Sequence, residues 1–193
     1  MQQAYWTQRY EQGSTGWDVG EATRPLKTYI DQLDNRDIRI LIPGSGNAYE
    51  AYYLYQHGFT NVWVLDISAY PLRAFRKQHP DFPAAHLLHQ DFFAHQERYD
   101  LILEQTFFCA LPPKMRPRYA QQMHQLLNQG GKLVGVLFNA PLYDDHPPYG
   151  GTSAEYINYF EPYFSAQIFE PCYNSIPPRQ GKELFIQLIK EPT

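Results

Sequence analysis

The chain has 193 residues and is 44% hydrophobic, so it is long enough for one domain, residues 1–193, with a sizeable core. Its net charge of −4, without a basic stripe, argues against a nucleic-acid partner. We find no apolar run that could span a membrane, no signal-peptide pattern, and no metal-ligand spacing at Cys109 or Cys172, so we expect a cytoplasmic protein.

The N-terminal part is predicted to be helical. A short helix over residues 4–12 ends at Gly13, and a second helix over residues 23–34 begins with Thr23 as its cap and Pro25 in its first turn. We expect residues 1–34 to form an N-terminal helical segment ahead of the sheet.

The rest of the chain alternates strands with helices until two strands finish it. Strands are predicted at residues 38–42, 61–66, 84–89, 99–104, 132–138, 164–170 and 182–189. Helices are predicted at residues 48–57, 68–79, 112–128 and 153–160, with Asn47, Ser68 and Ser153 as caps. This order predicts an α/β fold of three αβα layers, Rossmann-like, with a seven-stranded, mostly parallel sheet and an antiparallel C-terminal strand.

A strand, a glycine turn and a later acid form the most informative motif. The first strand runs into Pro43, Gly44, Ser45 and Gly46, and the second strand ends at Asp66, twenty residues after Gly46. Glycines let the backbone approach a ligand closely, and an acid at the second strand end can accept hydrogen bonds from two ribose hydroxyls. The motif therefore predicts an adenosine site.

The residue at the third glycine position of a dinucleotide motif is Tyr49 in this chain. The third glycine of Gly-x-Gly-x-x-Gly lets helix and strand pack around a pyrophosphate, and Tyr49 is far too bulky for that. Glu50 adds a negative charge to the first helical turn, where a pyrophosphate needs none. The pattern favours S-adenosylmethionine, which has no phosphate, over a nicotinamide dinucleotide.

Other reactive residues give weaker signals. His86 and His89 are an odd number of residues apart on a predicted strand, so they face opposite sides and we predict no metal site. Cys109 fits a small buried hydrophobe better than a nucleophile. Phe107 and Phe108 suit a core or a pocket wall equally well.

Fragments spread along nearly the whole chain resemble one family in their order and spacing. They are Trp-Asp-Val-Gly at residues 17–20, Leu-Ile-Pro-Gly-Ser-Gly at 41–46, and the segments at 6–17, 65–68, 91–93, 107–110, 115–117, 147–149 and 175–182. The chain thus resembles the thiopurine S-methyltransferase family of class I S-adenosylmethionine-dependent enzymes, and within it the thiol and halide methyltransferase branch. The resemblance implies that the N-terminal segment folds over the cofactor as a lid.

The resemblance implies a set of cofactor-binding residues. They are Trp6, Trp17, Pro43, Gly44, Ser45, Gly46, Asp66, Ile67, Gln90, Asp91, Phe92, Glu104 and Gln105. Asp66 would hold the ribose, while Asp91 and its neighbours would surround the adenine. Gln105 stands where the thiopurine branch often has an arginine, which distinguishes this chain from that branch.

The acceptor side is expected to need positioning more than acid or base chemistry. Methyl transfer from a sulfonium is an in-line displacement, and a thiolate or halide is already nucleophilic. A cationic donor and an anionic acceptor become neutral products, so a low-polarity pocket favours the reaction. We expect substrate contacts from Trp17, Phe107, Phe108, Tyr149 and Arg179. The candidate catalytic residues are Glu104, Tyr149 and Asp18, and Asp144 or His146 could also act as a base.

The predicted function is methyl transfer from S-adenosyl-L-methionine to a small soft nucleophile, such as a thiol, thiopurine, halide or chalcogen oxyanion, in detoxification. The coproduct would be S-adenosyl-L-homocysteine. Alternatives are transfer to oxygen or nitrogen of a small molecule, and cofactor binding without catalysis. The protein is expected to be a monomer or a weak homodimer.

Overall fold

The computed structural model describes residues 3–191, so residues 1–2 of the predicted lid and residues 192–193 of the predicted domain lie outside the described residues. Seven strands form one sheet in the order β3-β2-β1-β4-β5-β7-β6. The strands are β1 (Ile40–Pro43), β2 (Val62–Asp66), β3 (Leu87–His89), β4 (Tyr99–Gln105), β5 (Leu127–Phe138), β6 (Ser165–Pro171) and β7 (Glu183–Ile189).

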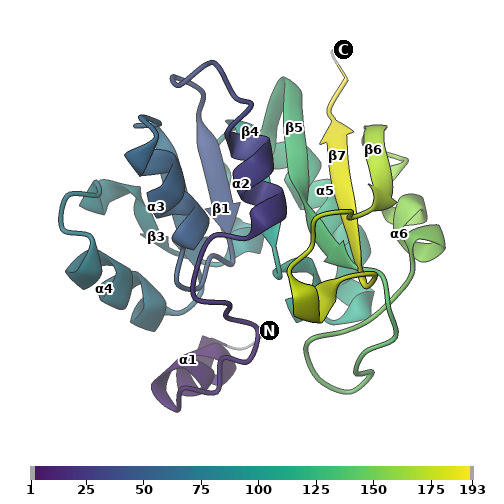
Figure 1. Cartoon of the computed structure of the whole chain (residues 1–193), viewed down its shortest axis with the longest axis horizontal. Coiled ribbons are helices and arrows are strands. Elements are labelled where there is room, and N and C mark those ends of the chain that lie inside the picture. Colours follow the sequence, from purple (N-terminus) through teal and green to yellow (C-terminus); the bar gives the residue numbers. More distant parts are fainter. Residues whose placement is uncertain (1–2, 192–193) are drawn as a thin grey trace.

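The pairing of the strands confirms the predicted sheet. Strands β1 to β5 pair in parallel, and β7 runs antiparallel to both β5 and β6 (Figure 1). In β1 the buried side chains alternate, because successive residues of a strand point to opposite faces. Ile40 and Ile42 join the core on one face, and Leu41 joins the core on the other.

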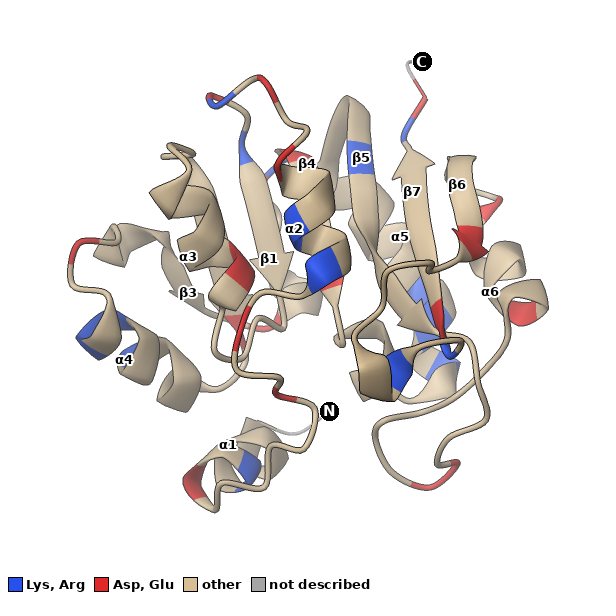
Figure 2. Cartoon of the chain, in the orientation of Figure 1, with Lys and Arg blue, Asp and Glu red and all other residues tan. Residues whose placement is uncertain are grey.

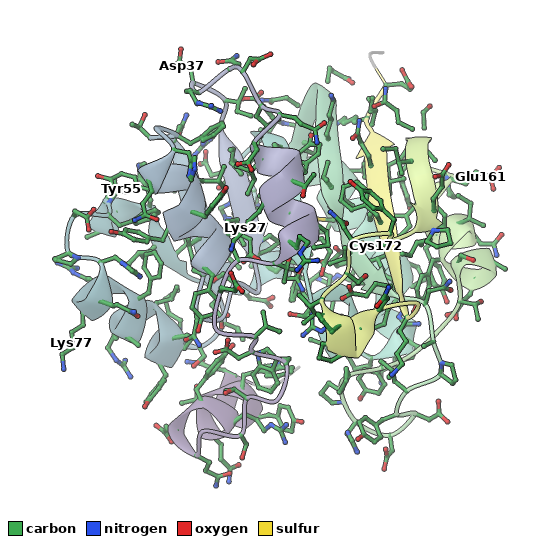
Figure 3. All side chains as sticks on the ribbon, in the orientation of Figure 1. Lys27, Asp37, Tyr55, Lys77, Glu161 and Cys172 are labelled. Atoms are coloured by element: carbon green, nitrogen blue, oxygen red, sulfur yellow. The ribbon has the colours of Figure 1, made fainter. Side chains whose placement is uncertain are left out.

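Helices cover both faces of the sheet, which gives the predicted three layers. The helices are α1 (Gln3–Glu11), α2 (Arg24–Ile30), α3 (Tyr49–Gln56), α4 (Ala69–Gln78), α5 (Arg116–Leu126) and α6 (Ser153–Phe160). Short 3-10 turns are η1 (Ala84–His86), η2 (Phe92–Ala94), η3 (Phe108–Ala110), η4 (Pro113–Met115) and η5 (Pro177–Arg179). Apolar side chains of α2, α3 and α4 fill the core on the face of Ile40, and those of α5 and α6 fill the core on the face of Leu41. Side chains pack densely between the layers, while Lys77 and Glu161 point outward at opposite flanks (Figure 3).

Helix α1 stands apart from these layers. It lies beyond the end of the sheet at which the parallel strands finish (Figure 1), and none of its residues is fully buried. The Thr7 Oγ1 atom lies 2.8 Å from Ser68 Oγ, and Gln3 Nε2 lies 3.1 Å from His89 Nε2. Such bonds contribute about 0.5–1.5 kcal/mol each. Contacts of this kind, rather than fully buried side chains, hold α1 against the rest of the protein.

Several boundaries differ from the sequence prediction. Residues 84–86 form a 3-10 turn, which leaves only Leu87–His89 as strand β3. Helix α2 ends at Ile30 rather than at residue 34. Strand β5 begins at Leu127, because Tyr99 already pairs with Leu127 ahead of the glycines at 130 and 131.

The helix caps agree only in part. Ser68 caps α4 as predicted, since its side chain accepts a hydrogen bond from the Tyr70 amide. The N-cap of α3 is Ala48, with a φ of 53°, rather than Asn47. Thr152, one residue before the predicted Ser153, caps α6 by accepting from the Glu155 amide. Among residues 3–191, no helix is long and apolar enough to cross a membrane.

Candidate functional site

A cavity of about 670 Å³, called here the large cavity, lies where four neighbouring parallel strands end. Its walls include Gly44 after β1, Asp66 and Ile67 at the end of β2, Asp91 after β3, and Phe107 after β4. Helix α1, the loop over residues 139–152 and the turn η5 complete the walls. Ligands of open α/β sheets bind in the crevice outside the carboxyl ends of the strands, so the large cavity is in the expected place.

The end of β2 aims a buried carboxylate at the glycine turn. Asp66 is 4% exposed; its Oδ2 accepts from the Gly46 amide at 3.0 Å and its Oδ1 from the Ser68 amide at 2.8 Å. Burial raises the pKa of Asp66, and the backbone hydrogen bonds oppose this shift. Each carboxylate oxygen has lone pairs left, so the group can accept further hydrogen bonds from a ligand.

The ring of Phe107 lies so close to residue 44 that only glycine fits there. Its φ is +59°, which favours glycine, and a Cβ atom at this position would lie 2.2 Å from Phe107 Cδ2. The ring of Phe107 therefore packs directly on the glycine turn and forms part of the cavity wall.

Glu104 holds the segment that carries Phe107. Its carboxylate is fully buried and accepts from the amides of Phe107 at 2.7 Å and Phe108 at 3.0 Å, and also from the Tyr119 hydroxyl. Burial raises the pKa of Glu104 to about 7, although these three donors favour the charged form. Glu104 thus faces the protein interior behind the cavity.

Aromatic side chains of the N-terminal segment close another side of the large cavity. The ring of Trp17 meets the rings of Trp6 and Tyr10 edge to face, with centroids 5.5 and 5.8 Å apart. Burial, together with the nearby carboxylates of Asp66 and Asp18, raises the pKa of Tyr10. Trp6, Arg9 and Tyr10 share one face of α1 because they are three and four residues apart.

A second cavity of about 50 Å³, called here the small cavity, adjoins the large one and shares Trp17, Gly44 and Thr106 with it. Its charged lining residues, among the part of the chain that the structure describes, are the acids Asp18, Glu21 and Glu50. Acids thus predominate among the lining residues of the small cavity, and one of them, Glu21, is paired with Lys27.

The acids of the small cavity are held in place by neighbouring donors. The Asp18 carboxylate accepts from the Gly20 amide at 2.7 Å, from the Tyr49 hydroxyl at 3.1 Å, and from the Asn47 side chain. The Glu50 carboxylate accepts from the Thr23 amide at 3.1 Å, and burial raises the pKa of Glu50.

The large cavity is lined by arginines as well as by Asp66 and Asp91. Arg9, Arg118 and Arg179 line it, and the basic positions at α1 and η5, far apart in the sequence, lie at the same end of the sheet (Figure 2). Arg179 is 8% exposed; its Nη2 donates to the Trp17 carbonyl at 2.7 Å, and its Nη1 lies 3.5 Å from Glu183 Oε1. The two adjoining cavities thus share Trp17, and, within the described part of the chain, arginines are found among the lining residues of the large one alone.

A family model described as Thiopurine S-methyltransferase (TPMT) matches residues 1–191. The chain belongs to the thiopurine S-methyltransferase family. Among its relatives, probable thiol methyltransferase 2 of Arabidopsis thaliana is 32% identical over 184 residues, which cover 92% of this chain and 81% of that protein. Thiocyanate methyltransferase 1 of Brassica oleracea is 31% identical and is matched over 95% of this chain and 83% of its own length.

A solved structure shows the same fold. The 1,6-didemethyltoxoflavin-N1-methyltransferase of Burkholderia thailandensis, crystallised with 1,6-didemethyltoxoflavin and S-adenosylhomocysteine, superposes with a TM-score of 0.78 at 16% identity, over 98% of this chain and 87% of that chain. The predicted family, Rossmann-like fold, cofactor and enzyme class are confirmed: this member of the thiopurine S-methyltransferase family is an S-adenosylmethionine-dependent methyltransferase.

Most residues predicted for the site line one of the two cavities. Those lining the large cavity are Trp6, Trp17, Gly44, Asp66, Ile67, Asp91, Phe92, Phe107 and Arg179. Those lining the small cavity are Trp17, Asp18, Gly44, Ser45, Gly46 and Gln105. The structure therefore brings together residues from both ends of the chain.

Five predicted residues line neither cavity: Pro43, Gln90, Glu104, Phe108 and Tyr149. Pro43 is the last residue of β1, and the Gln90 side chain pairs with His95 Nδ1 at 3.0 Å. Phe108 packs into the core against Tyr119 and Tyr156, with ring centroids 5.1 and 5.0 Å apart.

Tyr149 is displaced from the wall by the residues just before it. Its amide donates to the Cys109 carbonyl at 2.7 Å, and its own carbonyl accepts from Arg116 Nη2 at 3.3 Å. Held in this way, Tyr149 leaves His146, Pro147 and Pro148 to line the large cavity. His146, one of the two further base candidates, therefore reaches the cavity wall, whereas Asp144 does not.

Sequence analysis missed some lining residues, among them Tyr5, Arg9, Tyr10, Phe93, Met115, Arg118 and Tyr143. One signal could have found those on α1: with Trp6 taken as a site residue, the helical spacing places Arg9 and Tyr10 on the same face. Cys109 also lines the large cavity, and burial raises the pKa of its thiol to about 12.

Proposed function

We propose that this enzyme transfers the methyl group of S-adenosyl-L-methionine to a small soft nucleophile: a thiol, a thiopurine, a halide or a chalcogen oxyanion. The observation that carries the proposal is the large cavity, in which aromatic rings and arginines adjoin the glycine turn and Asp66. The names of the two plant relatives, a thiol and a thiocyanate methyltransferase, agree with such an acceptor.

The residues at the strand ends fit the donor. Gly44 and Gly46 offer backbone without a Cβ atom, and Asp66 has free lone pairs for ribose hydroxyls. Asp91 and Phe92, after β3, would contact the adenine, and the acids of the small cavity attract the positive charge of the methionine part. When bound, S-adenosylmethionine supplies the electrophilic methyl group.

The walls of the large cavity fit a soft anion. The rings of Trp17 and Phe107 exclude water and can attract the positive sulfonium by about 0.5–2 kcal/mol. Arg179 supplies positive charge for the acceptor. Asp18 has hydrogen-bond donors on both carboxylate oxygens and Glu104 is buried behind the wall, so we assign neither as a base. An acceptor that is already anionic needs no general base.

We further propose how the protein works as a whole. Residues 1–193 act as one domain, with residues 1–34 as a lid over the cofactor. The protein is a cytoplasmic monomer or weak homodimer that acts on small molecules in detoxification, without nucleic-acid or membrane partners. Its net charge of −4 supports this assignment.

The test is incubation with methyl-labelled S-adenosylmethionine and a panel of acceptors: hydrosulfide, an aryl thiol, a thiopurine, iodide, thiocyanate and tellurite. Amines and phenols of similar size serve as the comparison set. We expect label to pass to at least one soft acceptor and not to the comparison set. Transfer to amines or phenols alone, or tight donor binding without transfer to any acceptor, contradicts the proposal.

A further inference from the structure

Arg9 lines the large cavity as a cation and, among residues 3–191, has no hydrogen-bonded anion. Within the described residues, its Nε atom is buried and makes no hydrogen bond. Its guanidinium carbon lies 5.5 Å from the centroid of the Trp17 ring and 6.0 Å from that of Tyr5. Ring faces attract a cation but give its N–H groups no acceptor oxygen, and a buried donor without a partner costs about 1–3 kcal/mol. The arrangement lacks an acceptor at Arg9.

Arg179 approaches the same tryptophan from the other end of the chain. Its Nη2 donates to the Trp17 carbonyl at 2.7 Å, while Arg9 lies over the ring of Trp17. Two cations from α1 and η5 are thus brought to one residue, and both line the large cavity. Arg179 is paired with Glu183, whereas Arg9 has ring faces beside it, so an anion in the large cavity would add the missing acceptor at Arg9.

The two acids among the residues that line the large cavity, Asp66 and Asp91, accept backbone amides at the strand ends. Asp66 accepts from the amides of Gly46 and Ser68, and Asp91 accepts from the amide of Phe93 at 2.9 Å. Both acids follow strands β2 and β3, where the donor is proposed to bind. An anion from outside the protein is therefore the partner considered for Arg9.

We propose that Arg9 binds the anionic methyl acceptor together with Arg179, so that the lid helix α1 contributes directly to acceptor specificity. The inference rests on the proposed function, which places a soft anion in the large cavity. The ligand class is a small monovalent anion such as a thiolate, iodide or thiocyanate. A neutral acceptor would form only a weaker hydrogen bond with Arg9, without charge attraction, so discrimination between anionic and neutral acceptors follows from α1.

The test uses the full chain saturated with S-adenosylhomocysteine, which carries no methyl group and allows binding without turnover. Iodide is the probe, because it quenches tryptophan fluorescence and Trp17 lies at the proposed site. The variants are Arg9→Gln, which removes the charge, and Arg9→Lys, which keeps it. Arg73→Gln, which removes an exposed arginine of α4, is the matched control.

We expect saturable quenching by iodide in the wild type and in Arg73→Gln. Arg9→Gln should bind iodide about tenfold more weakly, Arg9→Lys should recover part of the loss, and the affinity for S-adenosylhomocysteine should change less than twofold. In turnover, Arg9→Gln should raise the KM for iodide while kcat stays within about threefold. Unchanged iodide binding in Arg9→Gln, or a loss confined to S-adenosylhomocysteine, overturns the inference. Saturable, Arg9-dependent binding without methyl transfer to any soft acceptor would instead overturn the proposed function alone.

Discussion

The small and large cavities adjoin, yet they differ in both size and charge. The small cavity measures about 50 Å³ and its charged lining residues, within residues 3–191, are acids. The large one measures about 670 Å³ and combines aromatic rings with three arginines and the acids Asp66 and Asp91. Under the proposed function, the acids of the small cavity attract the methionine part of the donor, and the arginines of the large cavity attract an anionic acceptor.

Gly44 lines both cavities, and Gly44→Ala should have the largest effect on stability and on donor binding. The new Cβ atom would lie 2.2 Å from Phe107 Cδ2, and the φ of +59° would strain any alanine. We expect a loss of about 2–4 kcal/mol in unfolding free energy and a fall of more than a hundredfold in donor affinity.

Gly58→Ala is the control for that prediction, since Gly58 has a φ of +86° but open space around it. Gly58→Ala should show the backbone strain of a positive φ without an overlap of the new Cβ atom with a neighbouring side chain. It should also bind the donor as the wild type does. Urea unfolding and isothermal titration with S-adenosylhomocysteine measure the two effects. Equal behaviour of the two variants would show that the contact with Phe107 is unimportant.

Asp66→Ala should have the next largest effect, a loss of donor affinity. Loss of the carboxylate removes the acceptor proposed for the ribose hydroxyls, so we expect donor affinity to fall about a hundredfold while the fold persists. Asp37→Ala, at an exposed loop position, is the matched control. Titration calorimetry and circular dichroism check both, and retention of wild-type affinity in Asp66→Ala would refute the ribose assignment.

Two variants, one in each cavity, test whether the acids serve the donor and the arginines serve the acceptor. Glu50→Gln removes a buried acid from the small cavity, and Arg179→Gln removes a buried cation from the large one. We expect the first to weaken S-adenosylmethionine about tenfold with little effect on the KM of an anionic acceptor, and the second to do the reverse. Steady-state kinetics with both substrates varied measures this, and the comparison fails if both variants affect the same substrate.

Glu104→Gln should have the smallest effect on either substrate, since Glu104 lies behind the wall. The pKa of Glu104 is raised from 4.5 to about 7, so the folded state keeps a proton that the unfolded state has lost between these pH values. Its contribution to the unfolding free energy therefore falls as pH rises through this window, by on the order of 3 kcal/mol.

Glutamine cannot ionise, so Glu104→Gln should gain stability relative to the wild type from pH 5 to pH 8. Urea unfolding across this range measures the gain, and the exposed Glu161→Gln is the control. Parallel pH profiles for the wild type and Glu104→Gln would show that the carboxyl does not titrate in this window.

The donor side was largely predictable from sequence because it depends on local chemistry. A glycine turn after one strand and an acid at the end of the next are read directly from the residues, and Gly44, Gly46 and Asp66 all line the cavities. Parallel strands then bring their carboxyl ends together without further information. The antiparallel finish was also predicted from the final strand pair, whereas the position of β7 between β5 and β6 is shown by the structure.

The acceptor side was harder, because it depends on which way neighbouring side chains turn. Phe107 lines the cavity and Phe108 enters the core, although they are adjacent and chemically identical. Glu104 is turned inward by the amides it accepts from, and Arg9 reaches the cavity only because α1 docks beyond the sheet. No local pattern encodes these tertiary contacts.

Cys109 places an unreactive thiol in the wall of the large cavity. Its thiol lines the wall, its Sγ donates to the Thr106 carbonyl at 3.3 Å, and its pKa is raised to about 12 by burial. Only a thiolate attacks an electrophile efficiently, so this thiol stays protonated and inert at neutral pH. An enzyme that methylates thiolates can therefore keep a cysteine beside its reactive donor without modifying itself.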